Sequence, residues 1–434
     1  MKEFEKIIGY DAIKKELIQI SDVLKNNEAY KKLGVTTPRG LMLYGEPGVG
    51  KTLMAETLIE ASGRKAFVCR KDKPNGDFVK AIKNTFKEAK EAAPSIVFLD
   101  DMDKFANGDS RHPDQEEYVT VQSCIDGIKN KDVFVLATAN DIDVLPESLL
   151  RAGRFDRVIE VCNPRGKDAE KIMDHYIKSK KCVGDVDAAF LARIMDGHSC
   201  AELETVINEA GLLAGYERAD VITTDHIIRA CLHTVYDIPN EVINAEPLNV
   251  DINDASLEAA RVIWHEAGHA TVAEALEPGS VTLVTGYSRR EGSGGFTTRY
   301  DSGYNGLIEN RIADICISLA GKAAIEQKFG ITDIGVSRDL DRAFRAVRNL
   351  IGSCCTNGFD LHSIGYEDTD ERRTKLEQAA AAEIERLYRK TKEILAQNND
   401  LLCGIAKALC EKSYLTAIDI ERIKKNCRTV KVAV

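Results

Sequence analysis

Residues 45–52 read G-E-P-G-V-G-K-T, a glycine-rich loop that ends in a lysine and a threonine. An apolar run of four residues precedes the loop and a helical pattern follows it, which is the context that a phosphate-binding loop requires. In such loops backbone N–H groups surround the phosphates, the lysine reaches the β and γ phosphates, and the hydroxyl binds magnesium. The sequence therefore predicts a nucleotide site made of Gly45, Glu46, Pro47, Gly48, Val49, Gly50, Lys51 and Thr52.

Short apolar runs surround this loop within the first 165 residues, and helical patterns separate them. Strands that alternate with helices form a parallel sheet with helices on its faces. We therefore predict a parallel sheet whose five strands are residues 41–44, 66–68, 96–99, 133–139 and 158–161.

Two aspartates, Asp100 and Asp101, directly follow the apolar run I-V-F-L. The carboxyl ends of parallel strands are where α/β sheets bind ligands. Such a pair alone would more often form a turn. Downstream of a phosphate loop, however, Asp100 is suited to hold magnesium and Asp101 to orient an attacking water.

A second motif lies in the other half of the chain, where residues 265–269 read H-E-A-G-H. A helical pattern covers residues 255–276, so His265 and His269 fall on one helix face and present two imidazoles to one Zn²⁺. Glu266 is placed to take a proton from a water on the metal. A catalytic zinc needs a third protein ligand, and spacing leaves these candidates open: Glu291, Asp301, Asp314, Glu326, Asp333, Asp339, Asp341 and His362.

The pattern changes along the chain predict four segments. The α/β unit covers residues 1–165, and a helical lid follows at 166–236, with Ser199 and Thr224 as expected N-caps. Residues 237–254 hold prolines, asparagines and acidic side chains without an apolar period, which indicates a linker. The last segment, 255–434, contains the H-E-x-x-H motif.

Charge and cysteine usage exclude several classes of protein. The chain has 434 residues and a net charge of −10, with basic and acidic residues interspersed, which argues against nucleic acid as the main partner. No apolar run approaches the roughly 18 to 20 residues that cross a bilayer. The 12 cysteines are dispersed and form no C-x-x-C pair. We therefore expect reduced thiols and a cytoplasmic location.

Two further stretches resemble the AAA+ ATPase family. A-T-A-N at 137–140 is similar to its sensor segment, and R-A-G-R-F-D-R at 151–157 is similar to its arginine-finger segment. The resemblance implies that Asn140 positions the attacking water. It also implies that Arg151 and Arg154 reach the γ-phosphate held by a neighbouring subunit of a ring, where the transition state develops negative charge.

The ATPase and zinc motifs together resemble the FtsH family of membrane-anchored, ATP-dependent zinc proteases. The likeness extends to N-E-A at 208–210 and G-K-A-A-I-E-Q-K-F-G at 321–330. It implies an α/β AAA+ module, with a five-stranded parallel sheet and a helical lid, followed by a mainly α-helical zinc metallopeptidase domain. The expected cofactors are Zn²⁺, ATP and Mg²⁺, and the expected partners are protein substrates and further copies of the chain in a homohexameric ring.

The resemblance also selects a third zinc ligand. In the family this ligand is an aspartate a few residues before a long amphipathic helix. The matching stretch, 336–339, reads V-S-R-D, so Asp339 is our choice.

The chain departs from the family pattern at several places. The family has glutamate where this chain has Asp101, so slower ATP turnover is expected. The pore segment, residues 73–78, lacks an aromatic at the expected position, which weakens the expectation of processive unfolding. The transmembrane helices that normally begin the family are not in this sequence. A methionine at position 1 favours a relative without that anchor over a truncated chain, and membrane association by another route stays open.

Two alternative functions remain at this point. One is an ATP-driven remodelling or chaperone machine whose zinc domain mainly stabilises a ring, an interpretation that the altered pore segment favours. The other is a peptidase for unfolded or small proteins in which nucleotide serves only assembly. Our leading hypothesis is an ATP-dependent zinc metalloendopeptidase that unfolds, translocates and degrades proteins.

Overall fold

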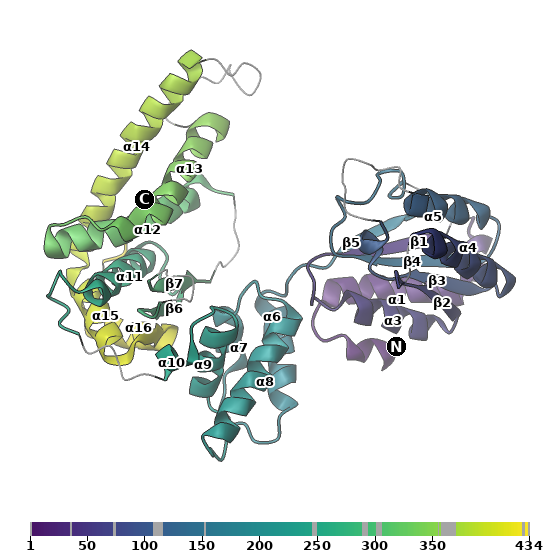
Figure 1. Ribbon diagram of the computed structural model, residues 1–434, viewed down its shortest axis with the longest axis horizontal. Helices are drawn as coiled ribbons and strands as arrows, with labels where there is room; N and C mark the ends of the chain where they lie inside the picture. Colours follow the sequence, from purple (N-terminus) through teal and green to yellow (C-terminus); the bar gives the residue numbers. More distant parts are fainter. Residues whose placement is uncertain are drawn as a thin grey trace. The chain divides into compact units, whose positions relative to one another are not determined.

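The structure is a computed structural model, which describes residues 2–34, 37–72, 75–106, 116–151, 153–244, 250–288, 294–300, 306–354, 356, 370–427 and 430–432. It divides into two compact units, Met1–Ile227 and Ile228–Val434. The division falls within helix α9 (Thr224–Thr234), and Figure 1 shows the elements of each unit.

The first unit is built on a five-stranded sheet with the strand order β2-β3-β4-β1-β5. Every pairing between neighbouring strands is parallel, which confirms the predicted sheet. The strands are β1 (Gly40–Tyr44), β2 (Lys65–Cys69), β3 (Ser95–Leu99), β4 (Val133–Ala139) and β5 (Arg157–Glu160).

Helices cover both faces of this sheet (Figure 1). One layer holds η1 (Lys2–Lys6), α1 (Asp11–Lys25) and α3 (Lys51–Ser62), and the other holds α4 (Asn75–Glu91) and α5 (Glu116–Gly127). Since β3 and β4 are buried along their whole length, their side chains read as continuous apolar runs rather than an alternating pattern. The short helices α2 (Asn27–Lys32) and η2 (Met102–Lys104) complete this part of the unit.

The predicted lid consists of α6 (Gly166–Lys178), α7 (Ala188–Ile194), α8 (Cys200–Tyr216) and α9. Ser199 caps α8 and forms a capping box with Glu202, so its predicted role is confirmed. The prediction of Thr224 as the cap of α9 was wrong by one residue. The hydroxyl of Thr223 accepts the backbone N–H of His226 at 3.3 Å, and the His226 ring accepts the Thr223 N–H at 3.0 Å. Thr223 is therefore the residue that caps the first turn of α9.

The second unit is mainly helical, as predicted, and contains one small antiparallel sheet with the order β7-β6-β8. Its helices pack around a shared apolar core in which α11 contacts α12 and α15. None of the helices in the described ranges combines the length and apolarity needed to cross a membrane. The elements are α10 (Asn240–Ile243), α11 (Glu258–Leu276), β6 (Val281–Thr285), β7 (Phe296–Arg299), α12 (Ile308–Phe329), η3 (Ile334–Val336), α13 (Ser337–Cys354), α14 (Asp370–Gln397), α15 (Asn399–Lys412), β8 (Tyr414–Thr416) and α16 (Ala417–Lys424).

Candidate nucleotide and metal sites

The glycine-rich loop joins β1 to α3, and Gly50 caps α3 with a left-handed backbone (φ 97°) that side chains rarely adopt. The Lys51 ammonium is folded onto this loop. It donates to the carbonyl oxygens of Gly45 at 2.7 Å and Glu46 at 2.8 Å, and to Oδ1 of Asn140 at 2.9 Å. The structure thus brings together Lys51 and Asn140, which lie 89 residues apart in the sequence. Burial lowers the pKa of Lys51, although the nearby Asp101 and Asp103 oppose that effect.

Asp100 lies at the carboxyl end of β3 and is 1% exposed. Its Oδ1 accepts a hydrogen bond from the Thr138 hydroxyl at 2.7 Å and lies 3.5 Å from the Thr52 hydroxyl, so the two residues predicted to hold magnesium are neighbours. Its Oδ2 pairs with the guanidinium of Arg70, a residue directly after β2. Sequence reasoning missed Arg70 because no motif surrounds it and because only the order of the strands places β2 beside β3.

Asp101 adopts a left-handed backbone conformation (φ 55°), and its N–H donates to the Thr138 hydroxyl at 2.9 Å. Its carboxylate pairs with Lys104 at 2.7 Å. Next to it, Asp103 accepts the backbone N–H of Asn140 at 2.9 Å and lies 3.4 Å from the Asn140 side-chain amide. Asp103, which the sequence analysis did not single out, therefore orients the predicted sensor residue.

We expect Asp101→Asn to lower steady-state ATP turnover by at least about 100-fold, because an amide cannot accept a proton from the attacking water. We also expect Asp101→Glu to raise turnover above that of the wild type, because the longer side chain restores the reach that the family pattern uses. Phosphate release at saturating Mg-ATP measures both effects. Asp220→Asn, at an exposed position between α8 and α9, is the matched control, and a turnover unchanged in Asp101→Asn would exclude the predicted role.

The two predicted finger arginines differ in their surroundings. Arg154 forms an ion pair with Asp126 on α5, with Nη2 2.9 Å from Oδ2, and it also donates to the carbonyl of Ser148. Hydrogen bonds from Arg154 and, to a lesser extent, Lys129 lower the pKa of Asp126 to about 2. Arg151 is exposed. Among the described residues, no recorded hydrogen bond or ion pair joins either arginine to the phosphate loop of its own chain. Their predicted role toward a neighbouring subunit stays a prediction.

The three predicted zinc ligands converge in the second unit. His265 and His269 lie on α11 and Asp339 lies in the first turn of α13, and one ligand atom from each falls within 4.8 Å of the others. Oδ2 of Asp339 is 3.0 Å from Nε2 of His265 and 3.3 Å from Nε2 of His269, and the two Nε2 atoms are 2.9 Å apart. Ligands at about 2.1 Å from a tetrahedral zinc lie about 3.4 Å from one another, so this donor set fits Zn²⁺ in atom type and in spacing.

Neighbouring groups orient these ligands. Nδ1–H of His269 donates to the carbonyl of Ile317 on α12 at 2.6 Å, which leaves Nε2 as the coordinating nitrogen. Gly321 lies one turn further along α12, and a Cβ at that position would fall 2.4 Å from the His265 ring. Only glycine therefore allows α12 to approach that imidazole. Burial would raise the pKa of Asp339, but hydrogen bonds from both histidines outweigh burial and hold this pKa well below its usual range.

Glu266 points its carboxylate toward the small sheet and is 4% exposed. Oε2 accepts a hydrogen bond from the hydroxyl of Thr297 at 2.8 Å. Thr297 lies on β7, one of the two edge strands of that sheet. The sequence analysis did not find Thr297, because a single threonine in a glycine-rich stretch has no recognisable pattern.

The remaining candidates for the third ligand are placed elsewhere or are not described. Asp314 pairs with Arg299 at 2.6 Å, Asp333 pairs with Arg261, and Asp341 is exposed outside the cluster of three ligands. Glu291, Asp301 and His362 lie outside the described residues, as do Lys73 and Pro74 of the predicted pore segment.

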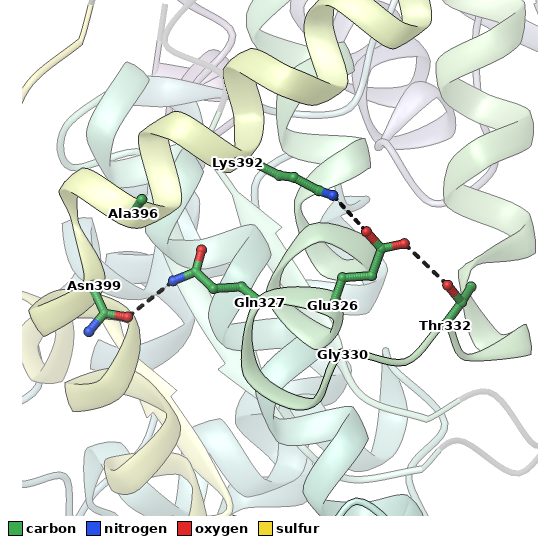
Figure 2. Close-up of a pocket in the computed structure, with 7 residues that line it drawn as sticks. All are labelled: Glu326, Gln327, Gly330, Thr332, Lys392, Ala396 and Asn399. Carbon is green, nitrogen blue, oxygen red and sulfur yellow. Dashed lines mark hydrogen bonds and ion pairs between the residues drawn. The ribbon is translucent and has the colours of Figure 1, made fainter.

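Glu326 belongs to a separate polar cluster at the end of α12 (Figure 2). Its carboxylate pairs with Lys322, lies 2.8 Å from Lys392 Nζ, and accepts hydrogen bonds from Tyr388 at 2.7 Å and Thr332 at 3.1 Å. The cluster borders a cavity of about 830 Å³ that none of the three converging ligand residues lines. The cavity is lined by Glu326, Gln327, Gly330, Thr332, Lys392, Ala396 and Asn399. We therefore assign Glu326 a structural role.

This role predicts a pH-dependent contribution to stability. Burial would raise the pKa of Glu326, but hydrogen bonds from Lys322, Lys392 and Tyr388 outweigh burial and lower it from 4.5 to about 2. The stabilisation is therefore present above the unfolded pKa near 4.5 and is lost as the pH falls toward 2. We expect Glu326→Gln to cost about 2 kcal/mol at pH 7 and progressively less below pH 4.5.

Urea unfolding followed by the fluorescence of Trp264, the chain's single tryptophan, measures this effect in the second unit. Glu377→Gln, which removes an exposed pair with Arg348, is the matched control and should leave the stability of the second unit nearly unchanged at both pH values. An equal loss in the Glu326 variant at pH 7 and pH 3.5 would contradict the prediction.

Comparison with known proteins agrees with this geometry. Residues 41–163 match the ATPase family associated with various cellular activities (AAA). Residues 255–423 match peptidase family M41. The chain is thus of the class that joins an AAA ATPase domain to an M41 peptidase domain.

Curated relatives narrow this class. The chain is 32% identical to ATP-dependent zinc metalloprotease FtsH of Metamycoplasma arthritidis, over 98% of this chain and 60% of the relative. It is 30% identical to the protein of that name from Thermus thermophilus, over 97% of this chain and 70% of the relative. It is 31% identical to ATP-dependent zinc metalloprotease FtsH 2 of Symbiobacterium thermophilum, over 97% of this chain and 74% of the relative.

The chain belongs to the FtsH family. This membership confirms the resemblance and the predicted fold class. The chain spans about 60% of the length of the Metamycoplasma and Mycoplasmopsis relatives that it matches.

Proposed function

We propose that this protein is an ATP-dependent zinc metalloendopeptidase with ATP hydrolase activity, which unfolds and degrades protein substrates. The observation that carries the proposal is the convergence of three ligand atoms, with the buried carboxylate of Glu266 directly after the first of them in the chain. The same chain also forms a phosphate loop between a strand and a helix. A zinc site that only stabilises a fold has no need of a buried carboxylate next to its ligands. This argues against the remodelling alternative.

In the proposed peptidase site, His265, His269 and Asp339 hold Zn²⁺. When bound, the metal supplies a Lewis acid that polarises the substrate carbonyl and lowers the pKa of a bound water. Glu266 accepts the proton of the attacking water and later delivers it to the nitrogen of the leaving amine. The Thr297 hydroxyl keeps the Glu266 carboxylate oriented for both transfers.

Strand β7 is suited to align the substrate. It lies at the edge of the small sheet and carries Thr297, which contacts Glu266. An edge strand offers unpaired backbone N–H and C=O groups to which an extended peptide can add as a further strand. Such pairing would present successive peptide bonds to Glu266 with little dependence on side-chain identity.

In the proposed ATPase site, the loop from Gly45 to Thr52 and Lys51 hold the phosphates, while Thr52 and Asp100 hold Mg²⁺. Asp101 and Asn140 orient the attacking water. Arg151 and Arg154 act on the nucleotide of the neighbouring subunit, which requires a ring that we propose is a homohexamer. The contact between Arg154 and Asp126 supports this role, because it keeps that guanidinium ordered at the end of α5 while no neighbour is bound.

We propose the cytoplasm as the location of the chain. The support is the state of the cysteines, which are free throughout the described residues, as expected in a reducing compartment.

The test is degradation of a fluorescently labelled folded protein with an unstructured tail, incubated with the zinc-loaded chain with and without Mg-ATP. We expect labelled peptides only with ATP and only from the wild type, with Glu266→Gln as the blank. Degradation of an unfolded substrate alone, at equal rates with and without ATP, would favour the peptidase in which nucleotide serves only assembly. ATP consumption without peptide release would favour the remodelling machine.

A further inference from the structure

Arg70 lies at the nucleotide end of the sheet, in a segment to which no role has been assigned. It directly follows β2, and its guanidinium reaches the adjacent β3 to pair with Oδ2 of Asp100. The two partners differ in burial, since the Arg70 side chain is 61% exposed and the Asp100 side chain is 1% exposed. A solvated cation therefore neutralises a carboxylate that water does not reach.

Arg70 contacts the Asp100 oxygen that no hydroxyl group engages in the described residues. Oδ1 of Asp100 is already engaged by the Thr138 hydroxyl at 2.7 Å and faces the Thr52 hydroxyl at 3.5 Å. Oδ2 is bound by Arg70 alone among the described residues. A cation that approaches Asp100 from the phosphate loop thus meets a carboxylate whose negative charge the guanidinium already neutralises.

Electrostatics makes the two cations alternatives. A buried carboxylate is costly without a partner, and a triphosphate brought close to it would add repulsion. Either Mg²⁺ or the guanidinium removes that cost, but both at the same oxygen would repel each other. In the described part of the chain Asp100 is the one recorded hydrogen-bond partner of Arg70, so the arginine can leave without breaking another contact.

We propose that Arg70 is a positioning residue that substitutes for magnesium at Asp100. It holds the carboxylate in the nucleotide-free chain, allows ATP to bind without metal, and is displaced toward the phosphates when Mg²⁺ arrives. This inference rests on the nucleotide-binding part of the proposed function and is independent of the peptidase.

The inference predicts how strongly nucleotide affinity depends on magnesium. In the wild type, Arg70 keeps the metal-free affinity high, so the ratio of the Kd in EDTA to the Kd in excess Mg²⁺ is small. In Arg70→Gln the uncompensated Asp100 faces the phosphates when metal is absent, while Mg²⁺ binds without a competitor when present. We expect the ratio to rise at least about tenfold, the effect of losing one charge-assisted hydrogen bond.

The experiment is a titration of the full-length chain with a fluorescent N-methylanthraniloyl derivative of ATP, in EDTA and in excess Mg²⁺. Arg70→Lys keeps the charge and should hold the ratio closer to that of the wild type than Arg70→Gln does. Lys65→Gln is the matched control, because Lys65 is an exposed cation at the opposite end of the same strand. A single cooperative thermal unfolding transition without ligand, well above the temperature of the titration, would show that each variant is folded.

The possible results distinguish the proposed role of Arg70 from the proposed nucleotide site. A ratio in Arg70→Gln within twofold of the wild-type ratio overturns the role of Arg70 and leaves the proposed ATPase intact. The same tenfold rise in Lys65→Gln would also overturn it, because the effect would then come from the loss of any positive charge and not from the contact between Arg70 and Asp100. No binding by the wild type under either condition would overturn both the inference and the proposed nucleotide site.

Discussion

Replacing Glu266 with glutamine is expected to lower kcat/KM for peptide hydrolysis by about 1,000-fold or more, with zinc still bound. The amide has nearly the same shape and can still contact the Thr297 hydroxyl, but it cannot accept a proton from the attacking water. General base catalysis by a positioned carboxylate contributes about 100- to 10,000-fold, and the same residue also serves the leaving amine. Cleavage of a fluorogenic peptide measures the effect.

Two further measurements make this test specific to the peptidase step. Zinc content, measured by elemental analysis, and ATP turnover should both match the wild type, since Glu266 is neither a ligand nor part of the nucleotide site. Glu258→Gln, an exposed position on the same helix, is the matched control and should leave hydrolysis unchanged. A variant at Glu266 that retains a third of the wild-type rate would show that another group is the base.

The second large effect is expected at Asp339. Replacing it with asparagine should weaken zinc binding by more than about 100-fold, because losing a direct ligand costs more than losing the groups that orient one, which already cost 10- to 100-fold. The neutral amide oxygen is a poorer ligand for a dication than the carboxylate. Peptide hydrolysis should disappear at zinc concentrations that saturate the wild type.

Competition with a chromophoric chelator measures this affinity directly. Zinc should also raise the melting temperature of the wild type, because it binds the folded state, and should fail to do so in the variant at the same concentration. Asp341→Asn is the matched control, since Asp341 lies two residues further along α13 and outside the ligand cluster. An unchanged zinc affinity in Asp339→Asn would return the third ligand to the open candidates.

The secondary structure could be predicted more completely in the first unit than in the second. In the first unit, apolar runs matched all five strands to within a residue or two. Strands β1, β3 and β4 are buried along nearly their whole length and must be apolar there, whereas β2 and β5 are more exposed. In the second, the pattern at residues 255–276 predicted α11, which begins at Glu258. The small sheet was harder, because its strands β7 and β8 are only four and three residues long.

The predicted zinc ligands could also be identified only in part from sequence spacing. His265 and His269 could be paired from their spacing, since a helix turns residues i and i+4 to one face. Asp339 lies 74 positions from His265, and spacing alone left eight candidates open until family resemblance selected one of them. The packing of α12 against α11, and of α13 against α12, is what places the carboxylate beside the imidazoles.

The sequence by itself determined the local chemistry: a phosphate loop between a strand and a helix, two imidazoles on one helix face with a carboxylate next to them, and the apolar runs that form the strands of the sheet. These features depend on residues that are near each other in the chain, where backbone periodicity sets the geometry. Only the tertiary structure decided that Arg70 pairs with Asp100, that Thr297 orients Glu266, and that Arg154 is held by Asp126. Those contacts join residues distant in sequence, so the packing of whole elements, rather than any local pattern, brings them together.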